Sequence, residues 1–130
     1  MIQNSTIKET QLKHWVSFCF ERGKMSKYQL ERKFQSKLKD HIWERIPDCK
    51  IIKNDPTGLQ GVPDLLVLYH GRFAALECKR NAAAAHRPNQ DYYIKQFAVD
   101  GYATFVYPEN EAQVVDDLVS YFGVDNDKVQ

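Results

Sequence analysis

The chain has 130 residues and a mass of 15.2 kDa, the size of one compact domain. Lys and Arg number 18, Asp and Glu 17, and 43% of residues are hydrophobic, which excludes a disordered chain and a histone-like polycation. No segment approaches the roughly 20 apolar residues of a membrane span, and three cysteines without close spacing favour a reducing compartment. We therefore expect a cytoplasmic protein that crosses no membrane.

Two helices are predicted in the first third of the chain. The first covers about residues 7–22 and carries an apolar stripe at helical spacing. The second begins after Ser26, which starts a capping-box pattern, and its apolar residues recur every fourth position as far as Pro47. We assign residues 1–24 to an N-terminal helix that is a candidate interface, residues 25–123 to the main domain and residues 124–130 to a short acidic tail.

A strand-rich pattern follows Pro47. His70 and Gly71 turn one predicted strand back into the next, which indicates a hairpin. Two strands are apolar at consecutive positions, which predicts a sheet that is covered on both faces. The order α-α-β-β-β-α-β-α therefore predicts an α/β fold in which helices flank a four-stranded sheet. The strands are expected over Cys49–Lys53, Asp64–Tyr69, Arg72–Lys79 and Tyr102–Tyr107, and the later helices over Gln90–Asp100 and Glu111–Phe122.

The hairpin is expected to place two carboxylates opposite each other. If the turn is centred between His70 and Gly71, the residue numbers of each pair across the hairpin add up to 141. Asp64 then faces Glu77, and Lys79, two residues after Glu77, lies on the same face. Opposed carboxylates repel each other, and a divalent cation would offset that repulsion. Mg²⁺ prefers one or two carboxylates together with waters and phosphate oxygens, so the backbone carbonyl of Cys78 is a candidate third, neutral ligand.

Lys79 would then lie near the metal-bound water, where it could orient that water or offset charge on a phosphate. The pattern is typical of metal-assisted phosphodiester hydrolysis. The alternative is a hairpin with charged ends, in which Asp64 and Lys79 form an ordinary salt bridge.

Three short motifs carry a family resemblance. Gly61-Val62-Pro63-Asp64, Glu77-Cys78-Lys79 and Pro88-Asn89-Gln90 resemble the PD-(D/E)XK nuclease superfamily, and more narrowly its stand-alone VRR-NUC branch. That branch is related to Holliday junction resolvases and is common in phage and bacterial genomes. The resemblance covers roughly residues 27–107 and implies a restriction-endonuclease-like core with a mixed sheet. It also implies that Asp64 and Glu77 bind Mg²⁺ or Mn²⁺ and that Lys79 serves the attacking water.

The resemblance implies two further site residues. Glu31 matches a glutamate on the helix that precedes the sheet, and Gln90 matches a glutamine on the helix after the lysine strand. For each of them a solvated helix surface is the alternative interpretation. Cys78 stands where the family commonly has a small or aliphatic residue, but its carbonyl would still be the ligand.

The distribution of charge bears on the partner. Residues 1–53 carry a net charge of +6, residues 54–95 carry +1 and residues 96–130 carry −6. A basic front half is typical of a polyanion-binding surface, although solvated helix faces give the same pattern. Cationic and hydrogen-bonding residues near the motifs are expected to contact nucleic acid: Lys53, Asn54, Gln60, Arg80, His86 and Arg87. The sequence contains neither a phosphate-cradling P-loop nor a dinucleotide fingerprint, so we expect no nucleotide cofactor.

By this resemblance the chain would be an Mg²⁺-dependent endonuclease acting on branched DNA such as a four-way junction. The alternatives are a nicking nuclease on duplex or flap DNA, and a non-catalytic DNA-binding or scaffold protein that has kept the fold. Symmetric cutting of a junction needs two active sites, so we expect a homodimer. The apolar stripe around Trp15 and Phe20 on the first helix is a candidate interface, with packing inside one subunit as the alternative.

Overall fold

The computed structural model describes residues 25–55 and 58–125. The helix predicted over residues 7–22, and with it the predicted interface, lies outside the described residues. The elements follow in the order α2 (Lys27–Arg45), β1 (Lys50–Lys53), β2 (Leu65–Tyr69), β3 (Arg72–Cys78), α3 (Pro88–Asp100), β4 (Tyr102–Val106) and α4 (Glu111–Phe122).

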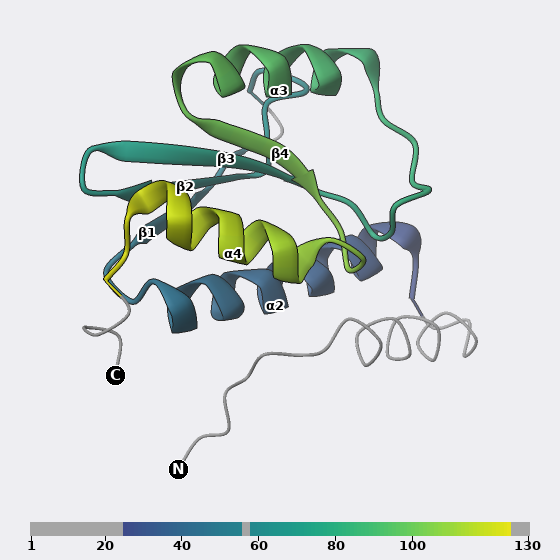
Figure 1. The fold of residues 1–130 in the computed structure, drawn as a ribbon. Coiled ribbons are helices and arrows are strands. Elements are labelled where there is room, and N and C mark those ends of the chain that lie inside the picture. Colours follow the sequence, from purple (N-terminus) through teal and green to yellow (C-terminus); the bar gives the residue numbers. More distant parts are fainter. Residues whose placement is uncertain (1–24, 56–57, 126–130) are drawn as a thin grey trace.

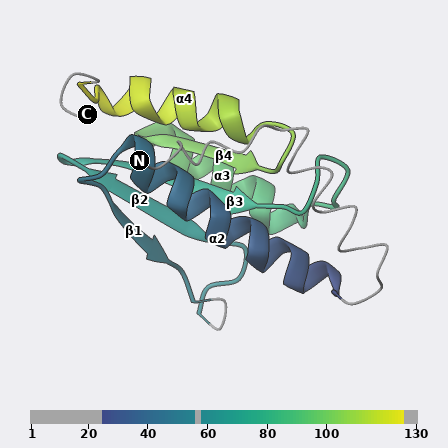
Figure 2. The same ribbon diagram turned by 90° about the horizontal axis from the view of Figure 1, so that it is seen from below.

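The strands form one mixed sheet in the order β1-β2-β3-β4. The first three run antiparallel to their neighbours, and β4 runs parallel to β3 after the crossover through α3. Figure 1 shows α3 on one face of this sheet and α2 with α4 on the other. In Figure 2, seen from below, α2 and α4 lie in front of the sheet and α3 lies behind it. The predicted α/β fold with a sheet covered on both faces is confirmed.

The core lies between the sheet and the layer formed by α2 and α4. The predicted stripe of α2 is fully buried there, because its apolar residues recur on one helix face. None of the residues of α3 is buried, and this helix meets the sheet through contacts such as Phe97 against Phe73, whose ring centroids are 6.0 Å apart. The face of the sheet under α3 is therefore less tightly covered, which leaves room for polar side chains. None of the helices in the described ranges is long and apolar enough to cross a membrane.

Helix α2 begins as predicted, with Ser26 and Gln29 forming a capping box through bonds of 2.8 and 3.2 Å. The start of α3 was predicted two residues too late. Pro88 occupies the first turn, where a helix does not need the missing N–H, and the side chain of Gln90 accepts a bond of 3.0 Å from the N–H of Arg87. The loop that precedes α3 therefore ends at Arg87.

The register of the hairpin is as predicted. All five pairs from Leu65–Leu76 to Tyr69–Arg72 have numbers that add up to 141. Both turn residues have positive φ angles, 46° for His70 and 80° for Gly71, as expected for the two-residue turns that match strand twist. β2 begins one residue later than predicted and β3 ends one residue earlier, so Asp64 and Lys79 lie just outside the two strands.

Candidate active site

A pocket of about 160 Å³ lies beside the end of β3. Its walls come from three parts of the chain: the end of the hairpin with Asp64 and Glu77, the start of α3 with Arg87 and Gln90, and the loop that leads from β1 to Asp64. Residues far apart in the sequence meet here because β3 and α3 are consecutive elements and the hairpin register aligns β2 with β3.

The carboxylate of Asp64 is held against the end of β3. Its Oδ2 accepts a hydrogen bond of 3.0 Å from the backbone N–H of Cys78. The backbone carbonyl of Asp64 accepts a bond of 2.8 Å from the N–H of Asn54, which fixes the loop on the other side. Because the N–H and C=O of one residue in an extended strand point to the same side, the carbonyl of Cys78 also faces Asp64.

Glu77 is the buried carboxyl of the site, with 4% of its surface exposed. Its Oε2 accepts a hydrogen bond of 3.1 Å from Nε2 of Gln90. Burial, followed by the charge of Asp64, raises the pKa of Glu77 to about 9, and Lys79 opposes that rise. Burial and the neighbouring Asp64 therefore favour the protonated form of the Glu77 carboxyl when no metal ion is bound.

Lys79 is also buried, with 6% exposed. Its Nζ donates to Oε1 of Gln90 at 2.7 Å and to the carbonyl of Ala85 at 3.1 Å. Gln90 thus bridges Lys79 and Glu77, and it reaches both from the first turn of α3. The structure places Gln90 inside the site rather than on a solvated helix surface.

Glu31 borders the site from α2. Its Oε2 lies 4.0 Å from Nη1 of Arg80, and both side chains are partly buried. Burial raises the pKa of Glu31, Lys79 lowers it and Asp64 raises it, so its carboxyl lies within electrostatic reach of both. Within the described ranges, no three His, Cys, Asp or Glu side chains form a metal-binding cluster. The site therefore offers two carboxylate side chains, with Glu31 at its border.

The residues expected to contact nucleic acid divide into two groups. Asn54, Gln60 and Arg87 line the pocket, and Arg80 faces Glu31 beside it. Lys53, at the end of β1, does not line this pocket.

His86 likewise does not line the pocket. Its ring stacks on Phe105, with 3.8 Å between centroids, and its Nδ1 lies 3.2 Å from Oδ1 of Asp91. This side chain therefore packs against β4 and the first turn of α3.

Sequence reasoning missed the role of Asn89. Its Nδ2 donates to the carbonyl of Gln60 at 3.1 Å. Gly61, which follows Gln60, has a φ of +89°. It packs against Asn89 so closely that an added Cβ would lie 2.6 Å from Cγ of Asn89. Asn89 therefore fastens the loop before Asp64 to the first turn of α3. A glycine three residues before Asp64 was the available signal, since only glycine tolerates this φ together with so close a contact.

Gln35 was also missed. It is 7% exposed, lies one turn after Glu31 on α2 and hydrogen-bonds the Cys78 thiol. Burial raises the pKa of that thiol well above its usual range. Gln35 and His41 are the two polar residues among the buried positions of α2, and the place of Gln35 beside Phe34 in the apolar stripe was the signal. Gln35 connects α2 to the strand end that carries the site.

The donor set suits a hard divalent cation. The carboxyl groups of Asp64 and Glu77 lie side by side, and burial of Glu77 together with the charge of Asp64 raises the pKa of Glu77, which a bound metal ion would offset. A backbone carbonyl faces the same place. Oxygen donors of this kind and number are those that Mg²⁺ and Mn²⁺ take from proteins, with the remaining positions left to water and phosphate.

Comparison with known proteins identifies the fold. No family model matches the chain, and no curated protein matches it. A solved structure described as a "VRR_NUC domain" is 26% identical in sequence, with a match that covers 72% of this chain and 97% of that one at a TM-score of 0.54. Another, described as a "VRR_NUC domain protein", is 20% identical, with coverage of 74% and 90% and a TM-score of 0.53.

The chain therefore has the restriction-endonuclease-like α/β fold of the PD-(D/E)XK nucleases. Within that class its structural neighbours are VRR_NUC domains, which confirms the resemblance predicted from the three motifs.

Proposed function

We propose that this chain is a metal-dependent endonuclease that hydrolyses phosphodiester bonds of DNA. The supporting observation is the bridge formed by Gln90. It joins the amine of Lys79 to the carboxyl of Glu77 at one wall of the pocket that Asp64 also lines. A hairpin with simple charged ends would pair Lys79 with Asp64, whereas Nζ of Lys79 is bonded to Gln90 and to the carbonyl of Ala85.

Asp64, Glu77 and the carbonyl of Cys78 would hold Mg²⁺ or Mn²⁺. A divalent ion bound there supplies a lowered pKa for coordinated water and polarises a phosphate oxygen. The carboxyl of Glu77 must lose its proton for this role, so ion binding and proton release are coupled.

Lys79 would act on the attacking water and on the phosphate. Its amine is fixed at two points, so its remaining N–H is directed rather than free to rotate. A fixed cation near the scissile phosphate stabilises the charge that develops in the transition state and needs little reorganisation. Gln90 keeps this amine beside the carboxyl of Glu77.

The proposed substrate is branched or structured DNA such as a Holliday junction, and the proposed active form is a homodimer. The relation of the VRR-NUC branch to junction resolvases supports the substrate, and the need for two active sites at a junction supports the dimer. The free thiols of Cys49 and Cys78 support a reducing compartment such as the cytoplasm.

The test is a cleavage assay of the purified full chain on linear, nicked, flap and four-way DNA of matched sequence, with Mg²⁺ and with Mn²⁺. We expect cleavage of the four-way or flap substrate, and no cleavage in EDTA or by Glu77→Gln. The Lys95→Ala variant is the matched control, because this exposed lysine lies on α3 outside the pocket. Binding of DNA without cleavage of any substrate would favour the non-catalytic scaffold.

A further inference from the structure

The first two turns of α2 carry an aromatic ring and a cation that face solvent together. Tyr28 is 66% exposed, more than Tyr92 (57%) or Trp43 (41%), which are also exposed. The guanidinium carbon of Arg32 lies 5.7 Å from the centroid of the Tyr28 ring. The two residues are four positions apart, so they are neighbours on one side of the helix.

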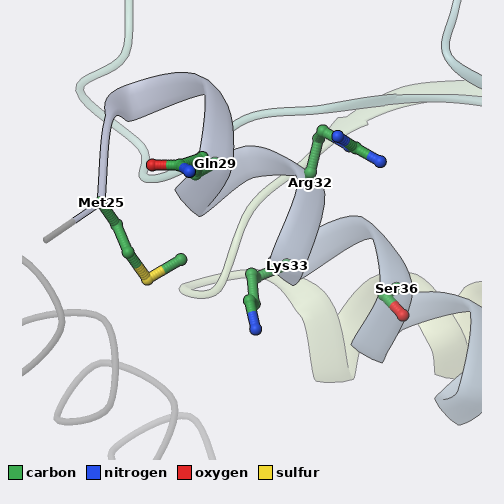
Figure 3. Close-up of a pocket in the computed structure, with 5 residues that line it drawn as sticks. All are labelled: Met25, Gln29, Arg32, Lys33 and Ser36. Atoms are coloured by element: carbon green, nitrogen blue, oxygen red, sulfur yellow. The ribbon is translucent and has the colours of Figure 1, made fainter.

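This pair lies next to the candidate active site. Glu31 directly precedes Arg32, is three positions after Tyr28, and meets Arg80 at the border of the pocket. Figure 3 shows Arg32 among the residues that line a surface pocket on α2, together with Met25, Gln29, Lys33 and Ser36. By helix geometry, the side of α2 that carries Tyr28 and Arg32 is the side adjoining Glu31.

Arg32 is an exposed cation near the start of α2. Arg32 forms no ion pair with any residue in the described part of the chain. An exposed cation–π pair contributes only about 0.5–1 kcal/mol to a helix, and most of the Tyr28 ring remains in water. Proteins bind single-stranded nucleic acid with aromatic rings that stack on bases and with cations that contact the phosphates, and an exposed ring beside a guanidinium offers both.

We propose that Tyr28 and Arg32 bind an unpaired segment of the DNA strand next to the bond that is cut. Tyr28 would stack on a base and Arg32 would contact a phosphate. A base within a duplex has both faces covered by its neighbours, so stacking on Tyr28 requires an unpaired nucleotide. The inference rests on the proposed nuclease function and deepens it, because among branched DNAs it favours one with a single-stranded arm, such as a flap, over a fully paired four-way junction.

The test is fluorescence anisotropy of the full chain in EDTA, which prevents cleavage, with two labelled DNAs. One is a blunt duplex, and the other is the same duplex with a single-stranded tail. We expect Tyr28→Ala to weaken binding of the tailed duplex about tenfold and to leave the blunt duplex unchanged. We expect Arg32→Ala to lower the salt slope for the tailed duplex by about 0.7.

Two variants serve as matched controls. Trp43→Ala removes another exposed aromatic ring from the same helix, about four turns beyond Tyr28. Lys95→Ala removes an exposed cation from α3. Both should leave the preference for the tailed duplex and the salt slope as in the wild type. Melting curves should show all four variants folded, since each altered side chain is exposed.

The possible failures are distinguishable. Equal weakening of both DNAs by Tyr28→Ala, or weakening of neither, would overturn the single-strand site and leave the proposed nuclease intact if the wild type cleaves DNA. A wild type that binds neither DNA and cleaves none would overturn both proposals. An equal loss in Trp43→Ala would also overturn the site, since the effect would then be a general property of the helix.

Discussion

Gly61 packs against Asn89 so closely that a side chain cannot be added. A Cβ atom at Gly61 would lie 2.6 Å from Cγ of Asn89 and 3.0 Å from its carbonyl carbon, and the φ of +89° disfavours any other residue. This contact joins the loop before Asp64 to the helix that carries Gln90. The spacing between the two walls of the pocket therefore depends on one glycine.

We expect Gly61→Ala to destabilise the protein by about 1–3 kcal/mol, through backbone strain and the displaced loop. Gly58→Ala is the matched control in the same loop, because its Cβ would meet its nearest neighbour at 3.7 Å and its φ is not positive. Urea unfolding of both variants measures the difference. Equal stability of the two variants would show that the Gly61–Asn89 contact is not tight.

The stability of the metal-free protein should fall as pH rises. Glu77 has a pKa of about 9 in the folded protein against a reference value of 4.5, so the folded state binds more protons between these values. The contribution of Glu77 to the free energy of unfolding is complete below about pH 4.5 and is lost as the pH rises toward 9. The free energy of unfolding should fall by at most about 1.4 kcal/mol per pH unit in this window.

Glu77→Gln is the control for this prediction, because the amide keeps the size of the side chain and does not titrate. Urea unfolding in EDTA across this pH window should give a flatter profile for the variant than for the wild type. If the unfolding free energies of the variant and the wild type changed in parallel with pH, a group other than Glu77 would be titrating.

Millimolar Mn²⁺ or Mg²⁺ should raise the melting temperature, because an ion that binds the folded state stabilises it by mass action. The increase should grow with pH, since the ion must displace the proton of Glu77. Asp64→Asn should shrink the metal effect. In EDTA it should raise the melting temperature only above about pH 9, where Glu77 is ionised and the two carboxylates of the wild type repel each other. A wild-type melting curve indifferent to both ions would contradict the metal site.

Two polar pairs join α2 to α4, and we expect them to contribute differently to the free energy of unfolding. His41 and Glu111 are 4% and 5% exposed and bonded to each other, whereas Arg45 and Asp116 form an exposed pair at 2.9 Å. We expect Glu111→Ala to cost about 2–4 kcal/mol, because it leaves a buried imidazole without its partner. Asp116→Ala should cost less than about 1 kcal/mol. Equal losses measured by urea unfolding would contradict this difference.

The sequence predicted the fold well because its elements have strong local signals. The capping box at Ser26 and the four-residue spacing up to Pro47 define α2, and the two-residue turn sets the hairpin register. The placement of Asp64 opposite Glu77 follows from that register alone. The predicted start of α3 at Gln90 is two residues late, because a proline in a sequence suggests a loop as readily as it suggests the first turn of a helix, which Pro88 occupies here.

The supporting contacts of the site were not predictable in the same way. The bond between Asn89 and Gln60 and the bond between Gln35 and Cys78 join residues that only tertiary packing brings together. Their partners depend on how helices sit on the sheet, and no local sequence pattern specifies this. The exposed pair of Tyr28 and Arg32 satisfies ordinary helix spacing, so its position beside the site became visible only in three dimensions.

The central claim is that Lys79 serves the chemistry of DNA cleavage rather than the binding of DNA. The most direct measurement compares Lys79→Ala with the wild type on the DNA that the wild type cuts best. Cleavage is followed with Mg²⁺, and affinity is measured separately in EDTA. We expect the variant to lose cleavage while its affinity stays within a few-fold, because one buried cation among several at the site contributes little to binding. Cleavage by the variant at the wild-type rate, or a loss fully explained by weaker binding, would contradict the account.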